Sequence, residues 1–498
     1  MNARRLRALV LLMGVVAMAR PVYASDSAFD ILRAERNISA TAGGAMTPGK
    51  EECPSGPPGR PLQLSEAVER SLCNNPKTRK AWADVKAQAA AVGVARSAYL
   101  PTISGDVDGV YEHSVTEIKS HPRQTSVYTA PVRSANASLN WLLYDFGARE
   151  ATLRNANALL EAARFTQDAT LQSVFASTAK DYYAAQAALG ALTATQDVER
   201  MTRDSMIAAK DRADKGVAPI SDALQAQTQH EEAVLNLTKA RGDAQTALGT
   251  LASDMDLNPD TPLEIPTVAK GNGPSEKIFG QNLAQLIEVV RNKHPSVRAA
   301  QAEYEAALAK VAQTRAQGFP SISLVGKYSH SDQPESQEQG SKAYPATSQD
   351  ASIGVQVSIP LFEGFGRYYK IHQAKAEAEK QLDTLDDAQR QAALDMWSSY
   401  HALTTATQNV ANSSNLLDIA QQAWEAARHR YDAGVTGILE LLNTQTALAN
   451  AKQRRVQALA DWNNARVDLA SKLGRLDAAD LEQKAVNPPP TPQEHPSR

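Results

Sequence analysis

Four stretches of the chain alternate apolar and polar side chains with a period of two, over about ten residues each. They lie at about 103–111, 135–143, 321–329 and 352–359. Their apolar-face positions are Ile103, Val107, Tyr111, Ala135, Ala137, Leu139, Trp141, Leu143, Ile322, Leu324, Gly326, Tyr328, Ile353, Val355, Val357 and Ile359. The residues between them are mostly Ser, Asn, Asp, Gln or Lys. Because successive side chains of a strand point to opposite faces, this pattern predicts four β-strands, each with one apolar and one polar face.

Helical periodicity occupies most of the remaining chain. Helices are predicted at 76–98 and 295–317, each just before a strand pair. Very long helices are predicted at about 148–215 and 367–433, each followed by a glycine turn and a shorter helix. At 1.5 Å per residue, a helix of about 68 residues is about 100 Å long. Helices of this length are not expected in a globular enzyme, so we predict an elongated layer of helices packed side by side along their length.

The final helix of each half has an apolar face that can pack on a neighbour. Its apolar residues recur at spacings of three, four and seven, and they are Leu237, Ala240, Ala244, Ala247, Leu251, Val456, Leu459, Trp462, Leu469 and Leu473. Alanine at such positions lets helix backbones approach closely. An ordinary coiled coil would show the same periodicity, so this pattern leaves that alternative open.

One helical turn occurs twice in the chain. RADKGVAPISDALQAQTQ, which begins at Arg212, and RYDAGVTGILELLNTQTA, which begins at Arg430, agree at eight of their first seventeen positions without a gap. Proline, which prevents a helix from continuing, recurs at nearly the same offset along the chain. The matching prolines are Pro76 with Pro295 and Pro101 with Pro320. These matches predict a tandem duplication of a whole substructure.

The chain therefore divides into six predicted segments. They are a signal peptide at 1–24, a Gly/Pro-rich segment at 25–61, repeat 1 at 62–252, a connector at 253–282, repeat 2 at 283–474 and a flexible tail at 475–498. The signal follows from basic residues before the apolar run Ala8–Ala19 and a small-residue cleavage site ending at Ala24. That run is too short to cross a bilayer, which needs about 20 residues. We therefore expect an exported protein without a transmembrane helix.

The chain has two cysteines, Cys53 and Cys73. In an oxidising compartment an even pair indicates one disulfide, which would tie the Gly/Pro-rich segment to the first helix. Two unpaired thiols are the alternative. A lipid anchor on Cys53 is not expected, because this residue lies far from the cleavage site.

The length of the alternating strands indicates a membrane. A tilted strand needs about 9–11 residues to cross a bilayer. Aromatic residues near the strand ends fit interfacial girdles, namely Tyr111, Trp141, Tyr144, Tyr328 and Phe362. Long polar loops are predicted at 114–133 and 331–350, as in outward-facing loops of membrane barrels. We predict a membrane barrel, with a small soluble β-domain as the alternative. Because four strands leave open edges in lipid, several copies must share one barrel. The edges alone leave the number of copies open; twelve strands from three copies, for example, would enclose a lumen wide enough for water.

Composition and motifs limit the possible functions. The formal net charge of −3 gives no reason to expect a nucleic-acid partner. The nine histidines lack metal-ligand spacing, and the sequence has no CxxC, no P-loop and no Gly-x-Ser-x-Gly motif. We therefore predict no catalysis, no cofactor and no metal. Because no nucleotide-binding motif is present, a water-filled barrel of this kind is expected to act as a passive conduit.

Four motifs give the chain a resemblance to the TolC family of outer-membrane efflux and secretion channels. They are LPTIS and FPSIS at the helix-to-strand junctions, IPLFEGFGR at the start of the second long helix, and RYDAGVTGILELLNTQTAL at the second turn. LCNNPKTRKAW resembles the branch that serves type I protein secretion. The resemblance covers about residues 62–475. It implies a mixed α and β membrane protein, a homotrimer in which a 12-stranded β-barrel with four strands per chain continues as a 12-helix periplasmic tunnel.

The same resemblance implies a location and partners. The barrel would cross the lipid bilayer of the outer membrane of a Gram-negative bacterium, with the helices in the periplasm. A periplasmic membrane-fusion adaptor and an inner-membrane transporter, either ABC-type or proton-driven, would be the partners. The cargo would be proteins, small molecules or both. The rival class is a periplasmic adaptor that forms no pore, and it would have one helical hairpin per chain.

In such channels, acidic residues just after the second turn ring a constriction at the inner mouth. By resemblance these positions are Glu440 and Asn443, of which Asn443 departs from the family's acid. In the first repeat, Ser221 and Asp222 would provide polar links that hold the closed state. An acid in the first helical turn also interacts favourably with the helix dipole, so Glu440 and Asp222 have a purely structural explanation too.

Two further features of the turns follow from the resemblance. Tyr431 matches a gating tyrosine of the family, whereas Thr436 stands where an arginine is frequent. The turns themselves would meet the inner-membrane partners, through Gly216, Val217, Gly434 and Val435.

Overall fold

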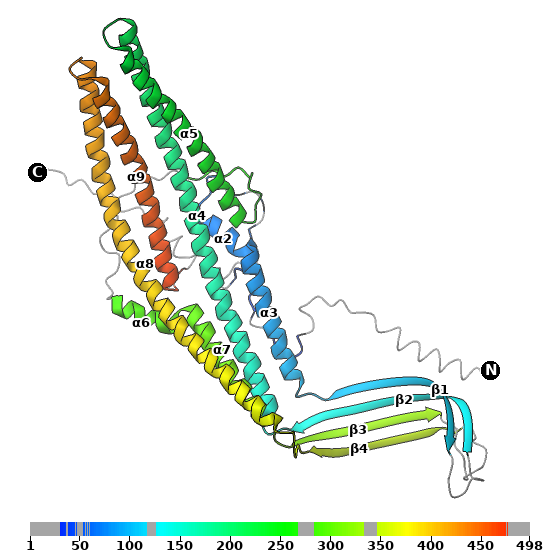
Figure 1. Ribbon diagram of the computed structural model, residues 1–498. Coiled ribbons are helices and arrows are strands. Elements are labelled where there is room, and N and C mark those ends of the chain that lie inside the picture. Colours follow the sequence, from blue (N-terminus) through cyan, green and yellow to red (C-terminus); the bar gives the residue numbers. More distant parts are fainter. Residues whose placement is uncertain are drawn as a thin grey trace, which may run out of the picture. The chain divides into compact units, whose positions relative to one another are not determined.

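The computed structural model describes residues 30–35, 38–44, 46, 53–54, 56, 58, 60–116, 126–266, 283–332, 346–474 and 476. The chain forms two compact units (Figure 1). The sheet unit comprises Met1–Ile38, Ala89–Tyr144 and Ser321–Val357, and the helical unit comprises Ser39–Gln88, Asp145–Pro320 and Ser358–Arg498. The predicted signal peptide, connector residues 267–282 and the tail from residue 477 lie outside the described residues.

The four predicted strands are confirmed. They are β1 (Thr102–Thr116), β2 (Ser126–Tyr144), β3 (Ser321–Asp332) and β4 (Ser348–Ser358). They form one sheet in the order β1-β2-β3-β4, with antiparallel pairing of β1 with β2 and of β2 with β3 (Figure 1). This order leaves β1 and β4 as edge strands of the chain's sheet.

The register keeps the apolar residues on one face. Ile103 lies opposite Leu139, and Trp141 lies opposite Leu324. A register shift follows between Leu142 and Tyr144. Because side chains alternate along a strand, this pairing carries one apolar face across β1, β2 and β3. Large apolar side chains on this sheet are exposed in the single chain.

The predicted outer loops are partly wrong in their bounds. The structure places 114–116 and 126–133 in strands, so β1 and β2 are 15 and 19 residues long. In the second pair, 331–332 and 348–350 are also strand. Backbone pairing continues past the predicted apolar stretch, as where His113 lies opposite Thr129, because ladder hydrogen bonds do not require apolar side chains.

Each helix that precedes a strand pair is divided into two. The pieces are α2 (Leu64–Asn74) with α3 (Pro76–Ser97), and α6 (Leu283–Lys293) with α7 (Pro295–Ala316). The sequence predicts helices at 76–98 and 295–317, which is correct, but not the breaks before them. Asn75 and His294 have extended backbones with ψ of 131° and 135°, because the ring of the following proline disfavours the helical conformation. Proline then occupies the first helical position, where no N–H is needed.

The two long helices are confirmed and have equal lengths. Each of α4 (Ala148–Asp214) and α8 (Gly366–Asp432) has 67 residues. Their partners α5 (Ile220–Asp254) and α9 (Ile438–Lys472) have 35 residues each. The four form two antiparallel hairpins, α4–α5 and α8–α9 (Figure 1). Among the described residues, no helix is both long and apolar enough to cross a membrane.

Both hairpins turn through the same backbone geometry. Gly216 and Gly434 have φ of 72° and 74°, the left-handed region that glycine adopts without strain. The N–H of Val217 donates to the carbonyl of Arg212, and the N–H of Val435 donates to the carbonyl of Arg430, each at 2.9 Å. These bonds satisfy carbonyls at the helix ends. The sequence match between the two turns therefore reflects one turn built twice.

Small apolar clusters along the rods hold the helical unit together. The long helix α4 packs on α2, α5, α7 and α9, whereas α8 packs on α6, α7 and α9. One cluster contains Met396, Leu403 and Leu469, and another contains Leu171 and Phe175. The predicted apolar face of α9 thus contributes to the core through Leu469. A core spread along the rods, and not gathered in one place, is what parallel columns of helices produce.

The segment before repeat 1 is attached to α2. A disulfide joins Cys53 to Cys73, with S–S 2.26 Å and Cα–Cα 5.7 Å. Close by, Arg70 donates from Nη1 to the carbonyl of Gly56 at 2.9 Å and pairs with Glu66. The disulfide and these polar contacts hold the segment before repeat 1 against the first helix.

A carboxylate pair where α5 ends makes stability depend on pH. Burial, and then the nearby Asp181 carboxyl, raise the pKa of Asp254 from 3.8 to about 7. The folded state therefore binds this proton more tightly than the unfolded state, so stability falls as pH rises from 3.8 towards 7. We expect Asp254→Asn to raise the midpoint of thermal unfolding at pH 8 and to change it little at pH 5, measured by circular dichroism. The control is Asp204→Asn on an exposed part of α4, and an equal gain at both pH values would contradict this account.

Candidate functional site

The carboxylate of Glu440, in the first turn of α9, is already paired. Arg430 Nη1 lies 2.8 Å from Glu440 Oε1, and the Thr436 hydroxyl donates to Glu440 Oε2. Both charged side chains are partly exposed, so the ion pair contributes only about 0–1 kcal/mol. In the single chain Arg430 therefore balances the charge of Glu440, which the sequence analysis did not anticipate. Thr436 acts here as a hydrogen-bond donor to that carboxylate.

The first tip is built differently. Asp222 lies in the first turn of α5, and Ser221 Oγ donates to Asp222 Oδ1 at 3.3 Å. The two tips therefore place an acid at matching positions, Asp222 and Glu440, but only the second acid has an arginine beside it in the described structure. Asp222 instead lies within electrostatic range of Tyr431 on the other hairpin.

Tyr431 is buried between the two hairpins. Its side chain is 4 % exposed and packs with Ile438 and Leu442. The guanidinium of Arg212 lies 4.2 Å from the centre of the tyrosine ring. Burial raises the pKa of Tyr431, Arg212 opposes the rise, and Asp222 adds to it, so the phenol is neutral at physiological pH. The residue that resembles a gating tyrosine is thus held inside the joint between hairpins.

Arg212 connects the two hairpins within one chain. From the last turn of α4, its Nη2 donates to the carbonyl of Tyr431 at 2.8 Å and to that of Asp432 at 3.2 Å. A cation beside the final carbonyls of α8 also interacts favourably with the helix dipole. Sequence reasoning missed Arg212. Its repeat counterpart Arg430, with the same position at the end of a long helix, was the available signal.

A second polar link joins α4 to α9 farther from the turns. The side chain of Gln445 is 2 % exposed, and its Nε2 donates to Ser205 Oγ at 2.6 Å and to the carbonyl of Met201 at 3.2 Å. Lys452 also pairs with Asp197 at 3.4 Å. Gln445 is one of the positions at which the two turn sequences agree, with Gln227 as its counterpart. The buried glutamine and the partly exposed ion pair both join α4 to α9 within one chain.

The remaining predicted residues lie on the surface of the tips. Asn443 is exposed one turn into α9. The turn residues Gly216, Val217, Gly434 and Val435 are also exposed, and both valines are more than 70 % accessible. Exposed valines at a hairpin end form a small apolar contact surface.

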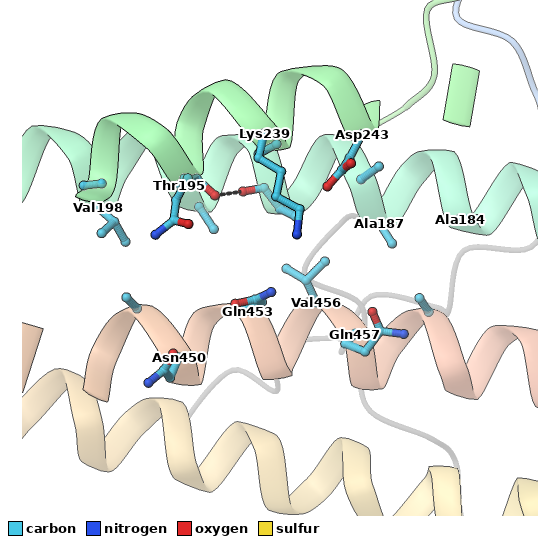
Figure 2. Close-up of a pocket in the computed structure, with 18 of the residues that line it drawn as sticks. Ala184, Ala187, Thr195, Val198, Lys239, Asp243, Asn450, Gln453, Val456 and Gln457 are labelled. Carbon is cyan, nitrogen blue, oxygen red and sulfur yellow. Dashed lines mark hydrogen bonds between the residues drawn. The ribbon is translucent and has the colours of Figure 1, made fainter. Parts of the chain in front are cut away.

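A groove of about 470 Å³ runs between α4, α5 and α9. Figure 2 shows Lys239 and Asp243 of α5 on one side and Gln453 and Val456 of α9 on the other. Alanines of α4 form much of the floor, and asparagine and glutamine amides complete the lining. Neutral amides with one cation and one anion favour water or a polar chain over an apolar ligand.

The described part of the chain contains no group of three His, Cys, Asp or Glu side chains placed to hold a metal ion. The features of the described chain that bear on function are the exposed apolar face of the sheet, the long hairpins and the charged tips. Together these features define an export channel of the outer membrane.

The chain belongs to the outer membrane efflux protein family, whose model matches residues 67–254 and 286–475. It is similar to protein CyaE of Bordetella pertussis, with 33 % identity over 84 % of this chain and 86 % of the relative. It is also similar to the outer membrane protein TolC of Escherichia coli, with 22 % identity over 84 % of this chain and 83 % of that protein. Among solved structures, the outer membrane channel CmeC of Campylobacter jejuni matches with a TM-score of 0.72 and 17 % identity, over 89 % of this chain and 94 % of CmeC.

These similarities confirm the predicted family, fold class and outer-membrane location. The two matched segments fall one in each predicted repeat, in line with the duplicated fold. The described chain also has two long hairpins and a four-stranded sheet, whereas the rival adaptor would have one hairpin and no such strands.

Proposed function

We propose that three copies of the chain form a continuous conduit, a 12-stranded barrel in the outer membrane followed by a helical tunnel in the periplasm. The observation that carries this proposal is the sheet, whose apolar face is exposed and whose strands β1 and β4 are edges of the chain's own sheet. Unpaired edges are too costly in lipid to remain open. Strands from neighbouring copies remove them, and twelve strands leave a lumen wide enough for water.

Transport through this conduit is passive, and partners supply the energy. A periplasmic adaptor and an inner-membrane transporter dock at the helical tips, where Val217 and Val435 offer exposed apolar contacts. The cargo we favour is protein. LCNNPKTRKAW supports this choice, as does similarity to the alkaline protease secretion protein AprF of Pseudomonas aeruginosa, which is 24 % identical over 86 % of this chain. Export of small molecules is the second candidate, and the chain itself carries out no catalysis.

The tips form the inner mouth of the conduit. Polar links across the hairpins, through Arg212, Tyr431 and Gln445, hold this mouth closed. Asp222, which accepts from Ser221, lies within electrostatic range of Tyr431 in this joint, and Asn443 is exposed one turn into α9. Three copies of Glu440 around one axis place three carboxylates at the mouth, and where Arg430 does not balance them they make a focus of negative charge that attracts cations.

Removing the charge at the mouth tests this assignment. We expect Glu440→Gln to reduce cation selectivity, measured as a smaller shift of the reversal potential across a salt gradient in planar bilayers. Asn443→Gln, which changes no charge one turn away, is the control. If the reversal potential of Glu440→Gln were unchanged, the assignment of Glu440 to the lumen would be wrong.

Purified full-length protein in a planar bilayer tests the function itself. We expect discrete conductance steps, and a heat-resistant oligomer three times the mass of the chain in detergent extracts of outer membranes. A protein released by osmotic shock as a monomer, electrically silent in bilayers, would overturn the proposed conduit.

A further inference from the structure

Because the chain consists of two similar repeats, a contact between repeat 1 and repeat 2 within one chain predicts a similar contact between repeat 2 of one copy and repeat 1 of the next. Within the chain, α4 of repeat 1 packs on α9 of repeat 2. At the offset that relates Arg212 to Arg430, the counterpart of α4 is α8 and the counterpart of α9 is α5. The pair α8 and α5 makes no comparable packing within the described residues of one chain. If the tunnel repeats this joint around its ring, α8 of one copy meets α5 of the next.

The exposure of equivalent residues in α9 and α5 supports a contact between α5 and α8 of a neighbouring copy. Ile438 and Leu442 of α9 are 2 % and 7 % exposed, because they pack around Tyr431 and against Met206 of α4. Their counterparts on α5, Ile220 and Leu224, are 69 % and 57 % exposed. The same apolar positions are thus covered in one repeat and open in the other.

The α8 side shows the complementary difference. Ala176 of α4 is 7 % exposed and lines a cavity together with Asp468 and Lys472 of α9. Its counterpart on α8 is the larger Leu394, which is 59 % exposed, and Trp397, one turn farther along α8, is 51 % exposed. Large apolar side chains left open on both matching faces fit a second copy of this chain, since each copy carries both halves of the joint. A head-to-tail contact of this kind closes into a ring.

Arg430 is the counterpart of Arg212 and lies at this predicted joint. Arg212 donates to the carbonyls of Tyr431 and Asp432, and the first of these also accepts from the N–H of Gly434. The counterpart carbonyls are those of Ala213 and Asp214, where the Ala213 carbonyl accepts from Gly216 in the same way. The neighbouring copy would therefore present to Arg430 the same helix end that Arg212 binds within the chain.

We propose, resting on the proposed trimer, that Arg430 changes partner on assembly. It leaves Glu440 of its own turn and donates to the carbonyls of Ala213 and Asp214 in the neighbouring copy. The exchange has two effects, because it closes the mouth between copies and leaves the carboxylate of Glu440 without its counter-charge. The position of the Arg430 side chain then determines both whether the mouth is closed and whether the carboxylate of Glu440 is balanced.

Cross-linking tests the joint in the assembled protein. Within the chain Lys180 pairs with Asp468 at 2.7 Å, and the counterpart pair is Ser398 with Thr250. We expect Ser398→Cys combined with Thr250→Cys to give dimer and trimer bands with a short bismaleimide on denaturing gels. The control is Ser398→Cys with Gln245→Cys, on another face of α5, which should give monomer. Monomer in both pairs would overturn the joint.

Conductance of the Arg430 and Glu440 variants tests the exchange. We expect Arg430→Ala to raise the open-to-closed ratio at least about tenfold, because two bonds from a charged donor are lost per copy. Glu440→Gln should not raise that ratio, and the double variant should match Arg430→Ala. Equal and non-additive gains from both single changes would show that the ion pair persists and would overturn the exchange.

These outcomes separate the inference from the proposed function. Normal conductance of the unmodified protein without the expected cross-links would overturn the joint and leave the conduit standing. Absence of conductance in the unmodified protein would overturn the conduit itself.

Discussion

Val355→Arg is expected to abolish the heat-resistant trimer, whereas the neighbouring change Gln356→Arg should leave it intact. Val355 lies near the middle of the apolar stretch of β4 and is 62 % exposed in the single chain. If that face meets lipid, an arginine near the bilayer midplane costs about 2–4 kcal/mol per copy. The cost over three copies is roughly 6–12 kcal/mol, which is comparable to the whole stability of a typical domain. Gln356 points to the opposite face, where the lumen holds water.

Outer-membrane fractions run on denaturing gels without heating measure this effect. The ratio of trimer to monomer should collapse for Val355→Arg alone. Equal loss of trimer for both variants would show that the two faces of β4 do not differ, and would favour the soluble β-domain over a barrel.

Arg212→Ala is expected to open the inner mouth. The change removes two hydrogen bonds from a charged donor and the contact with the ring of Tyr431. Hydrogen bonds to charged groups contribute about 1.5–3 kcal/mol each, and the ring contact about 0.5–1 kcal/mol if partly exposed. In the proposed conduit the mouth widens when the hairpins separate, so the open-to-closed ratio should rise tenfold or more.

Single-channel recording in planar bilayers measures that ratio directly. Arg200→Ala is the matched control, because Arg200 lies on the same helix in an exposed pair with Asp197. An open-to-closed ratio that is the same in Arg212→Ala and the control would show that the hairpins are held by other contacts.

Periodicity was enough to predict the strands and the long helices of this fold. Alternation gave all four strands, because a strand with one face in lipid and one in water has a strict period of two. The turn at Arg430 and its echo at Arg212 gave the duplication, since the same backbone geometry needs glycine at the same place. The breaks at Asn75 and His294 were missed, although the prolines after them carried the necessary information.

The contacts of the tips could not be predicted in the same way. Whether Arg430 pairs with Glu440, and whether Arg212 reaches the other hairpin, depends on how each helix is rotated against its neighbour. A repeat of 3.6 residues specifies a face but not which residue of the next helix lies opposite. Acids in the first turn of α5 and α9 were found because their position relative to the helix end is local.

The equal lengths of α4 and α8 have a consequence for how this chain can change over time. Inserting one residue into either rod would turn everything beyond it by about 100° and raise its tip by about 1.5 Å. Arg212 and Tyr431 would then miss each other, although each hairpin alone remained sound. An insertion or deletion in one of these helices should therefore be tolerated only when the other helix changes by the same number of residues. The two helix lengths are then expected to change together in evolution.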